Sequence, residues 1–97
     1  MAAYLVANYR ITNPEAYGAY PPAVIPTLAA HGAEILVADY ASEVVEGEPA
    51  SVTVVLKFSS KEAARTWYDS PEYQAIVRLR TDNTAGFSVL TEAFVMP

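Results

Sequence analysis

The sequence predicts an α+β protein: a ferredoxin-like β-α-β-β-α-β sandwich, with a four-stranded antiparallel sheet and two helices on one face. Three observations predict it. Strand-like and helix-like segments follow one another in that order along the chain. The 97 residues are enough for one domain, residues 1–97, and too few for two. Apolar residues make up 53% of the chain, enough to fill a core and leave an excess that needs burial elsewhere.

The first half of the chain begins with a predicted strand at residues 2–11, which are rich in β-branched and aromatic side chains. Asn13 and the proline after it are typical of a helix start. Apolar side chains at helical spacing continue to about Ala30. We expect a break near Tyr20, because the prolines that follow it disrupt a regular helix. Gly32 suits the C-terminal end of this helical region.

The second half begins with a predicted strand at residues 33–46, bent or bulged, and continues with a clearer strand at residues 51–58. Ser59 and Glu62 have the spacing of a capping box and predict a helix that runs to about Asp69.

A further helical piece is predicted after that helix, with Ser70 as its N-cap and a proline at its first position. Residues 82–86 are then expected to form a loop, and Phe87 to Val95 the last strand.

The predicted sheet is apolar on both faces. The third strand places Val54 and Leu56 on one face and Val55 on the other, and the last strand places Val89 and Leu90 on opposite faces. The face without helices is normally polar in a monomer. We therefore expect a homodimer in which a second copy covers that face.

Charge and composition exclude several classes of function. The net charge is −5, and nucleic-acid binding is not expected because phosphate contacts need a basic surface. Arg65, Arg78 and Arg80 are interpreted as a solvated helix face. The chain has no cysteine, so disulfides, thiolate nucleophiles and zinc-thiolate sites are excluded. The start of the chain has neither a signal-peptide pattern nor a membrane span, which makes a cytoplasmic location the expectation.

One block of residues carries a family signature around a Ser-Pro break between two helical segments. The block reads Trp67-Tyr68, then Ser70-Pro71-Glu72-Tyr73-Gln74. Further matching residues are Tyr17, Tyr20, Gly32 to Leu36, Glu46-Gly47, Val54 to Ser60 and Glu62-Ala63-Ala64. On these residues the chain resembles the domain of unknown function 1330 family, part of the dimeric α+β barrel superfamily. The resemblance implies the fold and a dimer built from two sheets, but no established activity. The chain departs from the family at His31-Gly32-Ala33, where the family tends to carry two glycines.

The superfamily resemblance also suggests chemistries to consider. Its members include cofactor-free monooxygenases, haem-degrading enzymes and lactone isomerases, with sites in a cleft between the sheet and the helices. Haem-degrading members use an Asn of the first strand together with a Trp and a His of the second helix. Asn8 and Trp67 suit that pattern, but the only histidine, His31, lies at the end of the first helix. Haem degradation is therefore not expected, and neither is another bound cofactor.

His31 is the candidate catalytic residue, because it is the only side chain of a type that titrates near neutrality. As a general base it would need a partner, and Glu34 is nearby in the sequence. The alternative, which we favour, is a polar residue that closes a helix. His31 and Glu34 supply at most two metal ligands, so no metal site is expected.

Five residues are candidates for ligand binding, because aromatic and amide side chains can line a pocket for a flat apolar molecule. They are Tyr4, Asn8, Trp67, Tyr68 and Tyr73. Alternatively, Trp67 and Tyr73 fill the core between helix and sheet, and Tyr68 lies at the edge of the dimer.

Two functions stay open. One is an enzyme or binder for a small hydrophobic or aromatic metabolite, resembling a monooxygenase or an isomerase, without a tightly bound cofactor. The other is a non-catalytic dimeric module for assembly or partner binding. A cavity of roughly 300 Å³ or more would favour the first. A cleft filled by Trp67 and Tyr73 would favour the second.

Overall fold

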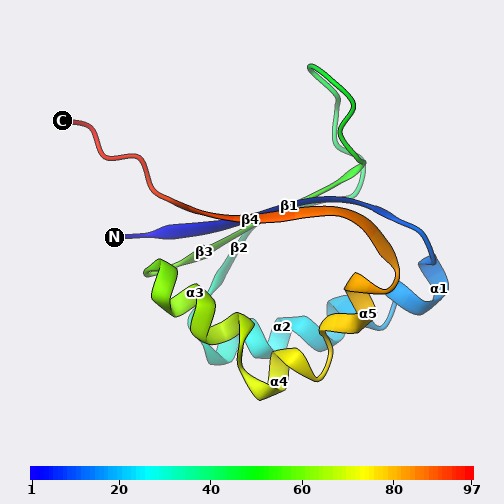
Figure 1. Ribbon diagram of the computed structural model, residues 1–97, viewed down its shortest axis with the longest axis horizontal. Coiled ribbons are helices and arrows are strands. Elements are labelled where there is room, and N and C mark those ends of the chain that lie inside the picture. Colours follow the sequence, from blue (N-terminus) through cyan, green and yellow to red (C-terminus); the bar gives the residue numbers. More distant parts are fainter.

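The computed structural model describes residues 1–97 and consists of two layers, a four-stranded antiparallel sheet with all helices on one side of it (Figure 1). The strands are β1 (Ala3–Ile11), β2 (Glu34–Asp39), β3 (Val52–Phe58) and β4 (Thr84–Glu92), in the spatial order β2-β3-β1-β4. The helices are α1 (Pro14–Tyr17), α2 (Tyr20–Ala30), α3 (Lys61–Tyr68), α4 (Pro71–Gln74) and α5 (Val77–Thr81). The predicted ferredoxin-like α+β class is confirmed. None of these helices combines the length and apolar character that crossing a membrane requires.

The register of the central strand β1 decides which side chains face the helices. Leu5 lies opposite Leu56 of β3 and Leu90 of β4, and this row points toward the helices. Because side chains alternate along a strand, Val6 and its neighbours point to the other side of the sheet.

The first helical region follows the predicted capping chemistry with one shift in its break. The Asn13 side chain accepts a hydrogen bond from the backbone of Ala16 at 3.3 Å. The break falls at residues 18–19, and α2 begins at Tyr20 with two prolines in its first turn, where a missing N–H costs no helical hydrogen bond. Gly32 ends α2 with a φ of 68°, in the left-handed region that glycine adopts without strain.

The second helical region is capped by a serine one residue later than predicted. Ser60, and not Ser59, is the N-cap of α3, and its hydroxyl accepts a hydrogen bond from the Ala63 backbone at 3.0 Å. Ser70 caps α4 as predicted, by accepting from the Tyr73 backbone at 3.3 Å. The helical piece after Ser70 is two short helices, α4 and α5, instead of one.

Two strand boundaries differ from the sequence prediction. β2 ends at Asp39 and not at residue 46, with a bulge between Ile35 and Val37. Residues 40–51 form a long loop that extends away from the sheet (Figure 1). β4 begins at Thr84, three residues before the predicted start, and ends at Glu92.

The core lies between the sheet and the helices. The largest fully buried side chains are Trp67, Tyr73, Phe58 and Val52. The Trp67 ring packs on Tyr73 with centroids 4.1 Å apart and on Phe58 at 5.5 Å. Its indole N–H donates to the Thr27 hydroxyl at 3.0 Å, so the one polar atom of this buried ring has a partner.

The opposite face of the sheet carries a row of four valines. Across the strands in spatial order, Val37, Val55, Val6 and Val89 are direct neighbours. We call them the valine row. No helix lies on this side of the sheet (Figure 1), and the outer members Val37 and Val89 are 39% and 46% exposed. The rows on either side are more polar: Asp39-Thr53-Asn8-Phe87 and Glu34-Lys57-Tyr4-Thr91.

Candidate functional site

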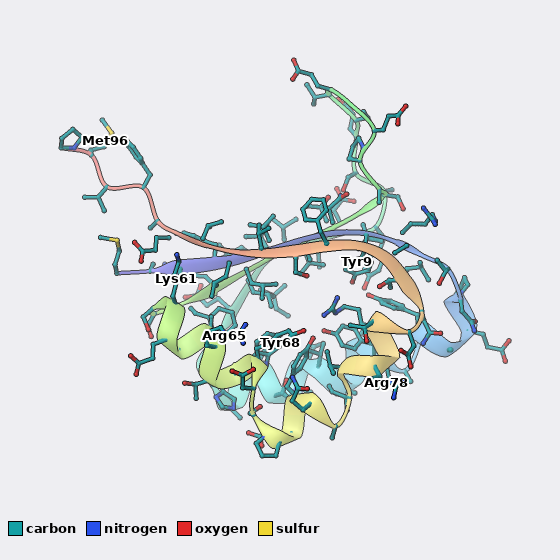
Figure 2. All side chains as sticks on the ribbon, in the orientation of Figure 1. Tyr9, Lys61, Arg65, Tyr68, Arg78 and Met96 are labelled. Carbon is teal, nitrogen blue, oxygen red and sulfur yellow. The ribbon has the colours of Figure 1, made fainter.

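A cavity of about 120 Å³ lies between the helix-covered face of the sheet and the helices, and it is partly open to solvent. Its lining is almost entirely apolar and aromatic. The sheet side provides Leu5, Ala7, Tyr9, Ile35, Ala38, Val54, Leu56 and Ser88, and Tyr40 follows β2. The helices provide Tyr17, Tyr20, Pro21, Val24, Ile25, Leu28, Trp67, Tyr68, Tyr73 and Arg80. Tyr9 and Tyr68 approach the cavity from opposite layers, one from the sheet and one from α3 (Figure 2).

Three aromatic rings from the signature block form one wall. Trp67 and Tyr73 are buried, and Tyr68 is half-buried at the end of α3. The Tyr68 ring centroid lies 5.3 Å from that of Tyr73 and 6.0 Å from that of Trp67. Ser70 and its proline turn the chain between α3 and α4, which brings the three rings together although they come from two helices.

Tyrosine hydroxyls provide most of the polar atoms of the cavity lining. Six of the seven tyrosines in the chain line it, and Tyr4 is the exception. The Tyr20 and Tyr73 hydroxyl oxygens are 2.8 Å apart, and those of Tyr9 and Tyr17 are 2.7 Å apart. A longer contact of 3.2 Å joins Tyr17 to Tyr40.

Burial makes three of these phenols, Tyr9, Tyr17 and Tyr20, harder to ionise by raising their pKa. Burial raises the pKa of Tyr17, and its hydrogen bonds with Tyr40 and Tyr9 raise it further. Burial also raises the pKa of Tyr20, with an added contribution from Tyr73. The hydroxyls can therefore donate and accept hydrogen bonds, but they are poor general bases.

Arg80 is the only charged residue of the lining. Its guanidinium carbon lies 6.0 Å from the centroid of the Tyr20 ring. Burial lowers the pKa of Arg80, but the Tyr73 and Tyr20 hydroxyls beside it raise that pKa by more, so the side chain stays charged. The interpretation of Arg80 as part of a solvated helix face is wrong, whereas Arg65 and Arg78 are exposed as expected.

A sequence signal for Arg80 exists in hindsight. It lies three residues after Val77 and seven after Tyr73, so it continues the helical stripe that those two buried residues define.

Asn8 and Tyr4, both candidate ligand-binding residues, lie on the open face of the sheet and outside the cavity. The Asn8 amide nitrogen donates to the backbone carbonyls of Ala50 and Val52 at 3.0 and 3.1 Å. Its amide oxygen accepts from the Ala50 backbone at 2.8 Å. Asn8 thus attaches the base of the 40–51 loop to the central strand.

His31, the candidate catalytic residue, also lies outside the cavity, at the C-terminal end of α2. Its Nε2 is 3.0 Å from the Glu72 carboxylate, which links α2 to the start of α4. This hydrogen bond is the main reason why the pKa of Glu72 is lowered. The cavity therefore has no histidine side chain that could act as a general base. Nowhere in the chain do three His, Asp or Glu side chains come close enough together to hold a metal ion.

A family model described as "Domain of unknown function (DUF1330)" matches residues 2–94. The chain belongs to this family. The predicted resemblance is thereby confirmed, and it covers the whole sheet and all helices of this DUF1330 protein. No protein of curated function matches the sequence.

Solved structures similar to this DUF1330 protein share its fold. A protein of unknown function from Rhodopseudomonas palustris has a TM-score of 0.81 and 16% identity, over 98% of this chain and 84% of that one. A dimeric protein of unknown function and ferredoxin-like fold from Bacteroides fragilis has a TM-score of 0.59 and 11% identity, over 95% and 96%. SnoaB, a cofactor-independent oxygenase from Streptomyces nogalater, has a TM-score of 0.60 and 12% identity, over 98% and 95%. At such identities the likeness establishes the fold and no activity.

Proposed function

We propose that the protein is a homodimer in which each subunit binds a small aromatic or apolar metabolite and transforms it without a tightly bound cofactor, as a monooxygenase or an isomerase would. The observation that carries this proposal is the partly open cavity, whose walls are aromatic rings that include two hydrogen-bonded tyrosine pairs. Apolar pockets with a few placed polar groups are the usual sites for such ligands.

The size of the cavity restricts the ligand. At about 120 Å³ it is below the roughly 300 Å³ that would favour an enzyme or binder on size alone, and Trp67 and Tyr73 are buried between helix and sheet. An apolar cavity of about 150 Å³ is able to hold benzene. The ligand is therefore a single ring or a molecule of that size.

The chemistry follows from what the lining contains. Neither a carboxylate nor an imidazole lines the cavity, and burial raises the pKa of the Tyr17 and Tyr20 hydroxyls. The protein would act by orienting an electron-rich ring and excluding water from it. SnoaB supports the oxygenase version of this proposal, since it has the same fold and is described as cofactor-independent.

The valine row supports the homodimer. An uncovered apolar row across a whole sheet is buried most simply against the same row of a second copy. The Bacteroides fragilis neighbour, described as dimeric, has the same fold.

The second candidate function is a non-catalytic dimeric module. The small volume of the cavity and the two large rings that fill the core favour it. It requires that no small aromatic molecule binds between the sheet and the helices.

A ligand screen with two matched variants tests the proposal. We expect single-ring molecules such as phenol, hydroquinone or benzoate to raise the thermal unfolding midpoint of the wild-type protein. Ala38→Phe places a ring in the cavity from β2 and should abolish this shift. Ala29→Phe adds the same ring on the exposed surface of α2 and should keep it. If no ring compound binds, or if Ala38→Phe binds as well as wild type, the proposed function is wrong. Oxygen consumption with each bound compound then separates an oxygenase from a binder.

A further inference from the structure

Three arginines lie on the helices α3 and α5. They differ in whether an acidic residue stands four positions later in the chain and pairs with the arginine. Arg65 is exposed and contacts Asp69 at 3.3 Å. Arg78 is exposed and contacts Asp82 at 3.1 Å. Arg80 has a threonine at the equivalent position, and no carboxylate lies within ion-pair distance of it.

The absence of an acid near Arg80 contrasts with the rest of the chain. Acidic residues number 11 and the net charge is −5, yet no acidic side chain lines the cavity. Arg80 is half-buried among aromatic and apolar side chains. Taking a charge out of water without a counter-ion costs free energy, and the lining around Arg80 provides none.

The tyrosine pair beside Arg80 adds a hydrogen-bond donor. Tyr20 and Tyr73 share one hydrogen bond of 2.8 Å between their hydroxyls. Each hydroxyl has one proton, and a single bond between them uses only one of the two. The second proton remains free to donate to a ligand, and burial disfavours ionisation of Tyr20 by raising its pKa.

We propose that the cavity recognises an oxyanion, a carboxylate or a phenolate carried on a single apolar ring, with Arg80 as its counter-ion and the Tyr20–Tyr73 pair as its hydroxyl donor. An oxyanion accepts hydrogen bonds and donates none, which matches a site that offers a cation and a hydroxyl. The ring fits the aromatic wall of Trp67, Tyr68 and Tyr73.

The same lining excludes other classes of ligand. A zwitterion such as an amino acid also needs an anionic partner for its ammonium group, and the cavity has none. A dianion would face a single positive charge in a small apolar space. The site therefore takes a monoanion.

This inference rests on the proposed function and makes it more specific, because it names the charge state of the ligand. A preference for the ionised form delivers a deprotonated reactant to a cavity that holds no carboxylate or imidazole base. Arg80 and the tyrosines then act in binding and orientation.

Titration calorimetry with benzoate and its neutral isostere benzamide tests the proposal. We expect the wild-type protein to bind benzoate more tightly by roughly ten- to hundredfold, the usual value of a charge-assisted hydrogen bond. Arg80→Met keeps most of the side-chain length and removes the charge, so it should abolish this preference and leave benzamide binding unchanged. Arg78→Met removes the exposed neighbouring charge and should change neither affinity.

The outcomes separate the two proposals. Equal binding of benzoate and benzamide by the wild-type protein would overturn the oxyanion proposal and leave the ring-binding function intact. Binding of neither compound would overturn the oxyanion proposal, and the proposed function as well if phenol and hydroquinone also fail to bind.

A measurement on the wild-type protein alone covers the case in which Arg80→Met does not fold. The visible colour of 4-nitrophenol reports its own ionisation. A site that favours the phenolate must lower the pKa of this ligand on binding. An unchanged or raised pKa of bound 4-nitrophenol would overturn the proposal.

Discussion

The two faces of the sheet contrast sharply, although the same four strands supply both. On the helix-covered face, Phe58 and Val52 are at most 2% exposed, and every buried side-chain polar atom in the protein has a hydrogen-bond partner. On the open face, the valine row has no helix over it, and its outer members are 39% and 46% exposed.

This difference shows that the two faces of one sheet make different kinds of contact. The helices of the same chain complete one face and leave a ring-sized cavity in it. The other face is apolar in its middle row and polar at both sides, which suits contact with another protein surface better than contact with water. Changes on the first face should alter the stability of a subunit, and changes on the second should alter association.

The largest effect is expected from Trp67→Ala on the helix-covered face. Trp67 is 1% exposed and packs on Tyr73 and Phe58, so its removal leaves a large cavity and takes away the N–H that the Thr27 hydroxyl accepts. We expect a loss of about 3–5 kcal/mol in the free energy of unfolding. Urea unfolding followed by circular dichroism, at fixed protein concentration, measures it. Trp67→Phe retains a ring and should lose clearly less. A loss below about 1 kcal/mol for Trp67→Ala would contradict this account of the core.

Val6→Asp tests the opposite face. Val6 lies in the middle of the valine row, and in a symmetric dimer the change introduces two carboxylates into one interface. We expect association to weaken by about 3 kcal/mol, or roughly a hundredfold in the dimer dissociation constant. Sedimentation velocity over a range of concentrations measures it. Thr66→Asp, on the exposed surface of α3, is the matched control and should leave association unchanged. An unaltered dimer in Val6→Asp would show that this face is not the interface.

Gly86→Ala tests how closely β1 and β4 approach each other. A Cβ at Gly86 would lie 2.2 Å from the Asn8 carbonyl oxygen and 2.5 Å from the Tyr9 Cα, so the two backbones must move apart. We expect a loss of about 1–3 kcal/mol and faster amide exchange along β1. Gly18→Ala is the control, since a Cβ there meets nothing closer than 3.4 Å. Equal stability of the two variants would rule out the close approach.

The smallest effect is expected from Glu72→Gln, which removes the ion pair with His31. The hydrogen bond from His31 holds the pKa of Glu72 below its ordinary value of 4.5. A carboxyl with a lowered folded-state pKa stabilises the fold above its ordinary pKa, and this contribution is lost as pH falls through the folded-state pKa. Glu72→Gln should therefore lower the thermal midpoint slightly at about pH 6, and the difference should shrink toward about pH 3.

Glu62→Gln is the matched control for that measurement. Glu62 also lies in the first turn of a helix but has no ion-pair partner. If both variants respond to pH in the same way, the His31 contact contributes nothing.

The sequence predicted those parts of the fold that local chemistry decides. Asn13, Ser70 and Gly32 end or begin helices by contacts with residues at most three positions away, so their roles can be recognised from spacing alone. The sequence predicts Ser59 as the N-cap of α3, but Ser60 has this role. Which serine can cap the helix depends on where β3 ends, and that end depends on the pairing of β3 with β1. The start of β4 likewise depends on its pairing with β1, far away in the sequence.

The candidate site was predicted in part, for similar reasons. Trp67, Tyr68 and Tyr73 belong to one contiguous signature and were found. Asn8 and Tyr9 face opposite sides of the sheet because side chains alternate along β1, but which side the helices cover is a tertiary property. Arg80 was interpreted as solvated because arginine is usually exposed, although its spacing from Tyr73 and Val77 continues their buried stripe.

The position of β1 in the middle of the sheet also determines when the sheet can form during translation. This middle strand is synthesised before the other three strands, and one of its two partners, β4, comes only after β2 and β3. At ordinary rates of translation, the strand waits on the order of ten seconds before its neighbour exists. The nascent chain cannot complete this sheet until β4 has been synthesised, so a product truncated before residue 84 would leave one edge of its middle strand unpaired.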